Sequence, residues 1–351
     1  MKIFNLLKKT IIILLSILVF LSIIGFIYES IARKKVLKNY PPPGKMVNVG
    51  DHNLHALIKG EGGPTVVFES GLGTDGHLSW YKIQDSIAKT ATTVTYDRAG
   101  LVYSERGKDP KTCKNIAEEL HDLLTNSGLA GPYILVGHSL GGLLILSFVE
   151  QYPEDVQGVI FVDAAHPEMF ERTRVYHEMI PIQPPYWLHS FASKVGVVRL
   201  LTRNSVQITG NSTTDECNIL INKLFPPSYP GYLQEFKQLD NLCNEVRDIK
   251  SFGNIPVISL YAAMNKNSVK TQFPGIRDEV IDKFIETVMD VRKSYSGLSS
   301  NGRSMMIENT GHYIHHDRPE VVINAIQEII RDIEKGSENI NNIPTIKEQN
   351  K

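Results

Sequence analysis

The chain has 351 residues, 42% hydrophobic and 21% charged, a composition that excludes intrinsic disorder and a disulfide scaffold. No repeat of fixed period is present, which excludes solenoids and propellers. The first 40 residues hold seven of the 37 basic and one of the 38 acidic side chains, so the remaining body carries a net charge of −7. That charge argues against a nucleic-acid partner, which requires a basic surface.

An uncharged apolar run covers residues 10–28 and is long enough to cross a bilayer. We predict a single-pass N-terminal anchor with the following domain outside the cytoplasm. Basic residues flank the run on both sides, so the positive-inside rule gives no clear orientation. The alternative is a cleaved signal peptide and a secreted protein, since Ser30-Ile31-Ala32 resembles a cleavage site. Pro41-Pro42-Pro43-Gly44 indicates a stiff spacer after the anchor.

Strand and helix patterns alternate from residue 46 onward. Two runs, 46–49 and 53–58, flank Gly50-Asp51 and predict a hairpin. Six further apolar, β-branched runs predict strands at 65–68, 92–96, 133–136, 159–162, 257–260 and 304–307. Amphipathic patterns predict helices at 79–88, 114–126, 140–150 and 319–332. This alternation predicts an α/β fold with a mostly parallel central sheet covered by helices on both faces.

The alternation is interrupted between residues 166 and 253 by scattered aromatic residues and prolines without a clear strand. We interpret that stretch as a helical lid. The predicted organisation is therefore a cytoplasmic tip with the anchor and basic flank (1–40), a first part of the core (41–165), the lid (166–253), a second part of the core (254–335) and a disordered tail (336–351).

The strongest chemical signal is Gly137-His138-Ser139-Leu140-Gly141, which directly follows a predicted strand and opens a predicted helix. A nucleophilic serine on such a strained turn needs neighbours without side chains, which the two glycines supply. The start of the helix also directs backbone N–H groups at the reaction centre. A structural turn is the alternative. We predict that Ser139 is a nucleophile.

The motif GHSLGG, the earlier YDRAG and a late Gly311-His312 together resemble the α/β-hydrolase superfamily, in particular its lipase and esterase-like members. The resemblance covers most of residues 46–335. It implies a Ser-acid-His triad in that chain order and an oxyanion hole made by two backbone N–H groups. It also implies that Asp97 and Arg98 of the YDRAG motif brace loops of the site instead of taking part in chemistry.

The resemblance places one oxyanion donor at Leu140, directly after the nucleophile, and the other at Leu72, in the turn after the third predicted strand. The family often has His-Gly where this chain has Ser70-Gly71, so the local hydrogen bonding must differ. An ordinary glycine-rich loop is the alternative for this segment.

His312 lies in the loop between the last predicted strand and the last helix, where the family carries its base. His315 and His316 are close by, but a metal site is not expected because no carboxylate shares their pattern. We predict His312 as the base, with neither metal nor cofactor.

The acid is harder to assign, because the segment after the 257–260 strand contains no carboxylate. Some relatives carry the acid at the end of the preceding strand, and Asp163 follows the 159–162 run directly. A carboxylate there requires a partner, which His312 would supply. We predict Asp163 as the acid, with Asp278 and Glu308 as rivals.

Together these residues predict a serine hydrolase that cleaves a carboxylic ester of a small-molecule or lipid-like acyl substrate. A serine in the elbow argues against the haloalkane dehalogenase and epoxide hydrolase branches, which use aspartate there. An acyltransferase or peptidase on the same triad, or a non-catalytic binding protein, are the alternatives. Pairing of Cys217 with Cys243 and the oligomeric state stay open.

Overall fold

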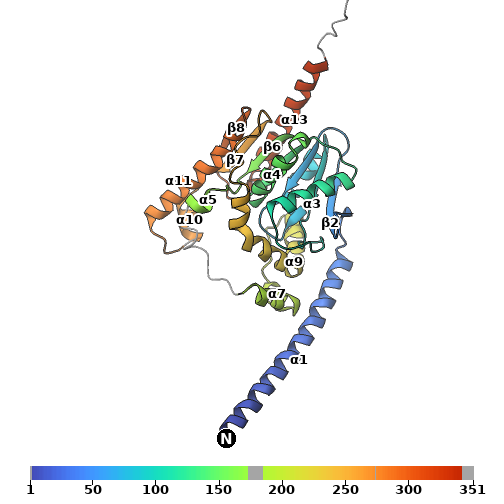
Figure 1. Cartoon of the computed structure of the whole chain (residues 1–351), viewed down its shortest axis with the longest axis vertical. Helices are drawn as coiled ribbons and strands as arrows, with labels where there is room; N and C mark the ends of the chain where they lie inside the picture. The colour runs from blue at the N-terminus through green and yellow to red at the C-terminus, as the bar shows by residue number, and fades with distance from the viewer. Residues whose placement is uncertain (1, 173–184, 273, 342–351) are drawn as a thin grey trace, which may run out of the picture.

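The computed structural model describes residues 2–172, 185–272 and 274–341. Its centre is an eight-stranded sheet in the order β1-β2-β4-β3-β5-β6-β7-β8, in which β2 runs antiparallel to both neighbours, β1 and β4, and all other neighbouring strands are parallel (Figure 1). The strands are β1 Lys45–Asn48, β2 Asn53–Lys59, β3 Thr65–Glu69, β4 Thr92–Tyr96, β5 Tyr133–His138, β6 Val156–Val162, β7 Val257–Ala262 and β8 Gly302–Ile307.

The predicted α/β fold is confirmed, and every predicted strand is present with its limits shifted by a few residues at most. The predicted hairpin is the antiparallel pair β1–β2. The central strands β3, β5, β6 and β7 are almost wholly buried. Burial on both faces explains why these segments are continuous apolar runs and not alternating ones.

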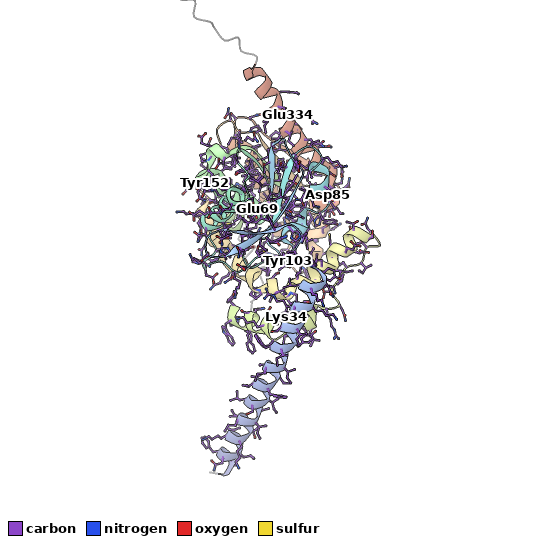
Figure 2. The ribbon with its side chains drawn as sticks, turned by 90° about the vertical axis from the view of Figure 1, so that its right-hand side faces the viewer. Lys34, Glu69, Asp85, Tyr103, Tyr152 and Glu334 are labelled. Atoms are coloured by element: carbon purple, nitrogen blue, oxygen red, sulfur yellow. The ribbon has the colours of Figure 1, made fainter. Side chains whose placement is uncertain are left out.

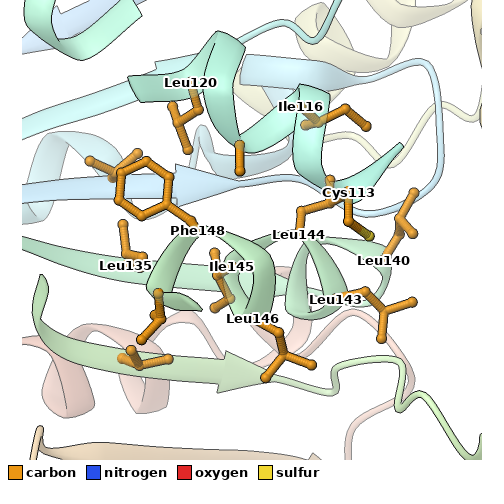
Figure 3. Close-up of a cluster of buried hydrophobic side chains, with 14 of the residues drawn as sticks. Cys113, Ile116, Leu120, Leu135, Leu140, Leu143, Leu144, Ile145, Leu146 and Phe148 are labelled. Carbon is orange, nitrogen blue, oxygen red and sulfur yellow. The ribbon is translucent and has the colours of Figure 1, made fainter. Parts of the chain in front are cut away.

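Helices cover both faces of the sheet, as expected. On one face α3 (Cys113–Asn126) and α4 (Leu140–Gln151) pack Leu120, Leu144 and Phe148 over Leu135 of β5 (Figure 3). On the other face, the neighbouring strand residues Ile134 and Val136 contact a second core beneath α13 (Pro319–Asn341). Successive side chains of one strand therefore contribute to two different cores.

The helices differ from the expectation in three respects. The segment expected as one helix at 79–88 is a 3₁₀ turn, Gly76–Trp80, followed by the short α2, Gln84–Ile87. Helix α13 continues to Asn341, into the predicted disordered tail, of which residues 342–351 lie outside the described residues. Two helices that we did not predict, α10 (Lys266–Gln272) and α11 (Asp278–Ser294), lie between β7 and β8.

The segment predicted as a lid is mostly helical where it is described; residues 173–184 lie outside that part. It contains α5 Met169–Arg172, α7 Tyr186–Lys194, α8 Val197–Thr202 and α9 Ser212–Glu245. Its function as a lid stays a prediction. The remaining short elements are the 3₁₀ turns Pro153–Asp155 and Tyr295–Leu298 and the helix α12, Ile314–Asp317. All three cysteines are free thiols.

Helix α1 (Lys2–Asn39) extends away from the domain (Figure 1) and, within the described residues, is the helix long and apolar enough to cross a membrane. Its C-terminal part contacts α7 and α9. Figure 2 shows Lys34 of α1 at the level of these helices, while Glu69 lies inside the domain. The proline spacer after α1 therefore does not separate this helix from the domain, because α1 packs on the domain before the spacer begins.

Candidate functional site

Ser139 lies on a sharp turn between β5 and α4, with φ 51° and ψ −120°. A Cβ atom at Gly137 would lie 2.8 Å from the Gly141 carbonyl oxygen, and one at Gly141 would lie 2.4 Å from that of Glu69. Only glycine fits at either position, because backbone atoms approach so closely. The turn is held in a conformation that non-glycine residues rarely adopt, a form of strain that is common at functional sites.

Three side chains from three loops form one hydrogen-bonded chain. His312 places Nε2 3.0 Å from Ser139 Oγ and Nδ1 2.6 Å from Asp163 Oδ2. Because an ionised carboxylate only accepts, Nδ1 carries the proton that is donated to Asp163. The lone pair of Nε2 then faces the Ser139 hydroxyl. Such an arrangement can take a proton from the serine.

Asp163 follows the last residue of β6 with a φ of 46° and is 1% exposed. Its Oδ1 accepts a hydrogen bond of 2.9 Å from the backbone N–H of Ala262, and Nη1 of Arg292 lies 2.8 Å away. The buried carboxylate therefore has a partner for each oxygen, as a buried charge requires. The structure therefore brings Ser139, His312 and Asp163 into hydrogen-bond contact.

The rival carboxylates lie elsewhere. Asp278 begins α11 and forms ion pairs with Lys266 and Lys270. The backbone carbonyl of Glu308 accepts a hydrogen bond from Arg318, and no described contact joins its side chain to His312.

Arg292 was not predicted as a site residue. It lies on the buried face of α11, one turn after Val288. An arginine among the apolar positions of an amphipathic helix is a detectable signal, because such a residue is rarely buried without a charged partner. The sequence does not reveal which carboxylate that partner is.

The predicted oxyanion donors lie on both sides of Ser139. Leu140 is the first residue of α4, so its N–H has no acceptor within the helix. Leu72 follows Gly71, where an added Cβ would lie 3.1 Å from Ser139 Cβ. The loop that carries Leu72 therefore passes directly beside Ser139. Among the described residues, the Leu72 N–H donates to no protein acceptor.

The guanidinium of Arg98 holds that loop in place through hydrogen bonds, as expected for the YDRAG motif. Its guanidinium donates to the carbonyl oxygens of Ser70 and Gly71 at 2.7 and 2.8 Å. It also donates to Glu69 at 2.7 Å and forms a two-pronged pair with Glu235 of α9, with both distances 2.8 Å. All three charged side chains are 1% exposed or less. Burial raises the pKa of Glu69, and the positive charge of Arg98 opposes this rise.

Buried His138 and His315 and half-buried His316 form a group beneath the His312 loop, with ring centroids 4.3 Å apart for each successive pair. Burial lowers the pKa of all three, and neighbouring imidazoles lower those of His138 and His315 further. His138 Nε2 lies 3.0 Å from the His312 backbone oxygen, which can only accept. His138 therefore donates to the loop that carries His312.

One group in the described part of the chain has the composition of a metal site: His55, His77 and Asp97, whose candidate ligand atoms lie within 4.8 Å of one another. Both histidine Nδ1 atoms lie 2.8 Å from an Asp97 oxygen. Burial opposes ionisation of Asp97, yet the charges and hydrogen bonds of the two histidines hold its pKa well below its usual range. This pattern matches a carboxylate bonded to two imidazoles and braces the loop after β4.

A cavity of about 370 Å³ opens beside Ser139 and His312. Val269 of α10 and Phe284 and Val288 of α11 form its apolar wall. No residue of α7, α8 or α9 lines it. Among the described residues, the helices that contribute most to this lining are therefore the pair between β7 and β8, while the segment predicted as a lid contributes Met169 of α5.

Comparison with known proteins identifies the family of the fold. The family model described as the alpha/beta hydrolase fold matches residues 64–319. The protein YqjL of Bacillus subtilis is 24% identical over 280 residues, covering 79% of this chain and 87% of YqjL. Methylesterase 1 of Arabidopsis thaliana is 30% identical over 96 residues, covering 26% of this chain and 36% of that protein.

The chain spans only 20% and 51% of the length of the first two curated relatives that it matches. Among solved structures, the epoxide hydrolase CorEH has a TM-score of 0.57 at 17% identity, covering 82% of this chain and 98% of CorEH. Likeness at this level concerns the fold alone.

We expect the free energy of unfolding to fall as the pH drops below about 6.5, the value of an unfolded histidine. The pKa values of His138, His315 and His316 are lowered in the folded state, so below that pH the unfolded chain binds protons that the folded chain does not. Each such group adds a slope of up to about 1.4 kcal/mol per pH unit. Urea denaturation at several pH values measures it. His315→Gln should flatten the dependence, and equal slopes in wild type and His315→Gln would contradict the prediction.

Glu235→Ala should lower the free energy of unfolding by about 3 kcal/mol or more, because it leaves the buried Arg98 guanidinium without its two-pronged partner. The matched control is Glu216→Ala at an exposed position of the same helix, which should change stability by about 0.5 kcal/mol or less. Urea denaturation measures both variants. Similar losses in the two would show that Glu235 contributes no more than a surface residue.

Proposed function

Because this chain belongs to the alpha/beta hydrolase family, we propose that it is a serine hydrolase that cleaves a carboxylic ester, or a related acyl bond, through an acyl-enzyme intermediate. The observation that carries the proposal is the hydrogen-bonded chain from Asp163 through His312 to Ser139 on a strained turn. Roles and geometry of this kind, more than sequence position, identify a catalytic triad.

In the proposed reaction, Ser139 Oγ attacks the carbonyl carbon of the substrate while His312 Nε2 takes its proton. Asp163 orients the imidazole and stabilises its positive charge. The negative charge on the former carbonyl oxygen is stabilised by the N–H groups of Leu72 and Leu140. His312 then gives its proton to the leaving alcohol, and a water molecule activated by the same imidazole releases the acid.

The cavity beside Ser139 supports an apolar acyl group as the part of the substrate that is held. Val269, Phe284 and Val288 give it an apolar wall, while its polar side chains are Ser139, Asp163 and His312 at the hydrogen-bonded chain and Asn265, Ser268, Arg292 and Thr310 around it. Such a distribution favours an apolar ligand oriented by a few polar contacts.

We also propose that α1 is an uncleaved membrane anchor and that the catalytic domain lies outside the cytoplasm. Support comes from Glu29, whose carboxylate is paired with Arg199 of α8 at 2.7 Å through both oxygens. Signal cleavage after Ala32 would remove Glu29 and leave Arg199, which is only 12% exposed, without this partner. A full-length chain that does not float with lipid vesicles would contradict the anchor.

Ser139→Ala should abolish labelling by a fluorophosphonate probe and lower ester turnover on the order of 10⁴-fold or more, because the probe and the substrate both react with Oγ. Asp163→Asn should keep the chain folded and lower turnover about 10²- to 10⁴-fold. The control is Ser205→Ala at an exposed position. Unchanged labelling of Ser139→Ala would refute the proposed nucleophile.

Val288→Phe should shorten the preferred acyl chain, because the larger ring occupies the apolar wall of the cavity. Hydrolysis of long-chain esters should fall much more than hydrolysis of an acetate ester. A panel of esters of increasing chain length measures the change, and Glu286→Phe on the exposed face of α11 is the control. A uniform loss for all esters would instead indicate a general disturbance of the site.

A further inference from the structure

Six large apolar side chains are exposed on two consecutive helices outside the active site. They define the α7–α8 patch: Trp187, Leu188, Phe191, Val197, Leu200 and Leu201, each between 42% and 74% exposed. On each helix they are three or four residues apart or adjacent, so they share one side. An apolar cluster of this kind on a folded domain usually marks a contact with another molecule or a membrane.

The turn that joins α7 to α8 packs against α1 where its uncharged run ends. A Cβ atom at Gly25 would lie 2.3 Å from the Val195 carbonyl oxygen, and one at Gly196 would lie 2.9 Å from the ring of Tyr28. The ion pair of Glu29 with Arg199 follows directly. The patch therefore lies at the level of the last turn of the apolar run.

The length of that run sets the height of the patch relative to a membrane. Residues 10–28 of α1 span about 28 Å at 1.5 Å per residue, close to the thickness of a bilayer core. If this run crosses the membrane, its end near Tyr28 lies at the boundary between the acyl chains and the head groups. Helices packed at that point lie at the same boundary.

We infer that the α7–α8 patch inserts into the surface of the bilayer that α1 crosses. The inference rests on the proposed anchor. Its partner is the lipid surface because the turn between α7 and α8 packs on α1 at the end of that helix's exposed apolar run. Trp187 and Phe191 are of the aromatic type that is favoured at such boundaries.

The charges around the patch agree with a lipid surface that carries anionic head groups. Lys194 ends α7 and Arg203 follows α8, and both are exposed. Arg33, Lys34 and Lys35 are exposed on α1 one to two turns beyond Glu29. A basic rim around an apolar face is the pattern of elements that lie in the plane of the membrane.

The chain offers a direct optical test, because its two tryptophans are Trp80, which is 1% exposed, and Trp187, which is 67% exposed. The full-length protein is reconstituted in vesicles of phosphatidylcholine and phosphatidylglycerol, with and without brominated acyl chains. Bromine quenches tryptophan only at close range. We expect quenching in the wild type and its loss in Trp187→Phe, which retains only the buried Trp80.

A second pair of variants distinguishes insertion of the patch from a general effect of adding a surface charge. Leu201→Asp places a charge in the patch and should reduce the quenching of Trp187. Met305→Asp is the matched control, since Met305 is 45% exposed on β8, away from α7 and α1 (Figure 1). Equal quenching in Leu201→Asp and Met305→Asp would overturn the inference.

Flotation of the same vesicles distinguishes failure of the proposed anchor from failure of the inferred insertion of the patch. A chain that floats but shows no bromine quenching keeps the anchor and overturns the inference. A chain that does not float overturns both. If the α7–α8 patches of two copies crosslink to each other and bromine does not quench Trp187, the patch contacts a second chain. That result would also overturn the inference.

Discussion

The site depends on one buried cation. The guanidinium of Arg98 donates to the carbonyl oxygens of the loop that carries Leu72, and it binds Glu69 and Glu235 from two other elements. Inside a domain each such bond is stronger than in water, and each unpaired charge is more costly. The position of the loop beside Ser139 is therefore tied to α9, which lies far away in the sequence.

Much of the fold follows from local sequence. Each central strand is a short β-branched run buried on both faces, so its position is evident without knowledge of its neighbours. The elbow at Ser139 is likewise specified locally, because two glycines, a strand and a helix suffice to define it. Asp163 and His312 required the order of the strands as well, and the structure places both within hydrogen-bond distance of the predicted partners.

Contacts between residues far apart in the chain could not be predicted from local sequence patterns. Arg292 meets Asp163, and Glu235 meets Arg98, across 129 and 137 residues of chain, and no local pattern joins either pair. The segment at 79–88 has helical periodicity, yet tertiary packing of Trp80 against the sheet divides it into a 3₁₀ turn and one helical turn.

Two insertions on the same edge of the sheet have different neighbours. The one between β7 and β8 encloses the space beside Ser139, whereas α7 and α8, inserted between β6 and β7, contact α1. Under the proposed function, substitutions in the first can change the acyl group that fits while the contacts between α7 and α1 stay the same. If both proposals hold, a change of accepted acyl group and a change of membrane attachment map mainly to different insertions, so related chains can differ in substrate while staying at the same membrane.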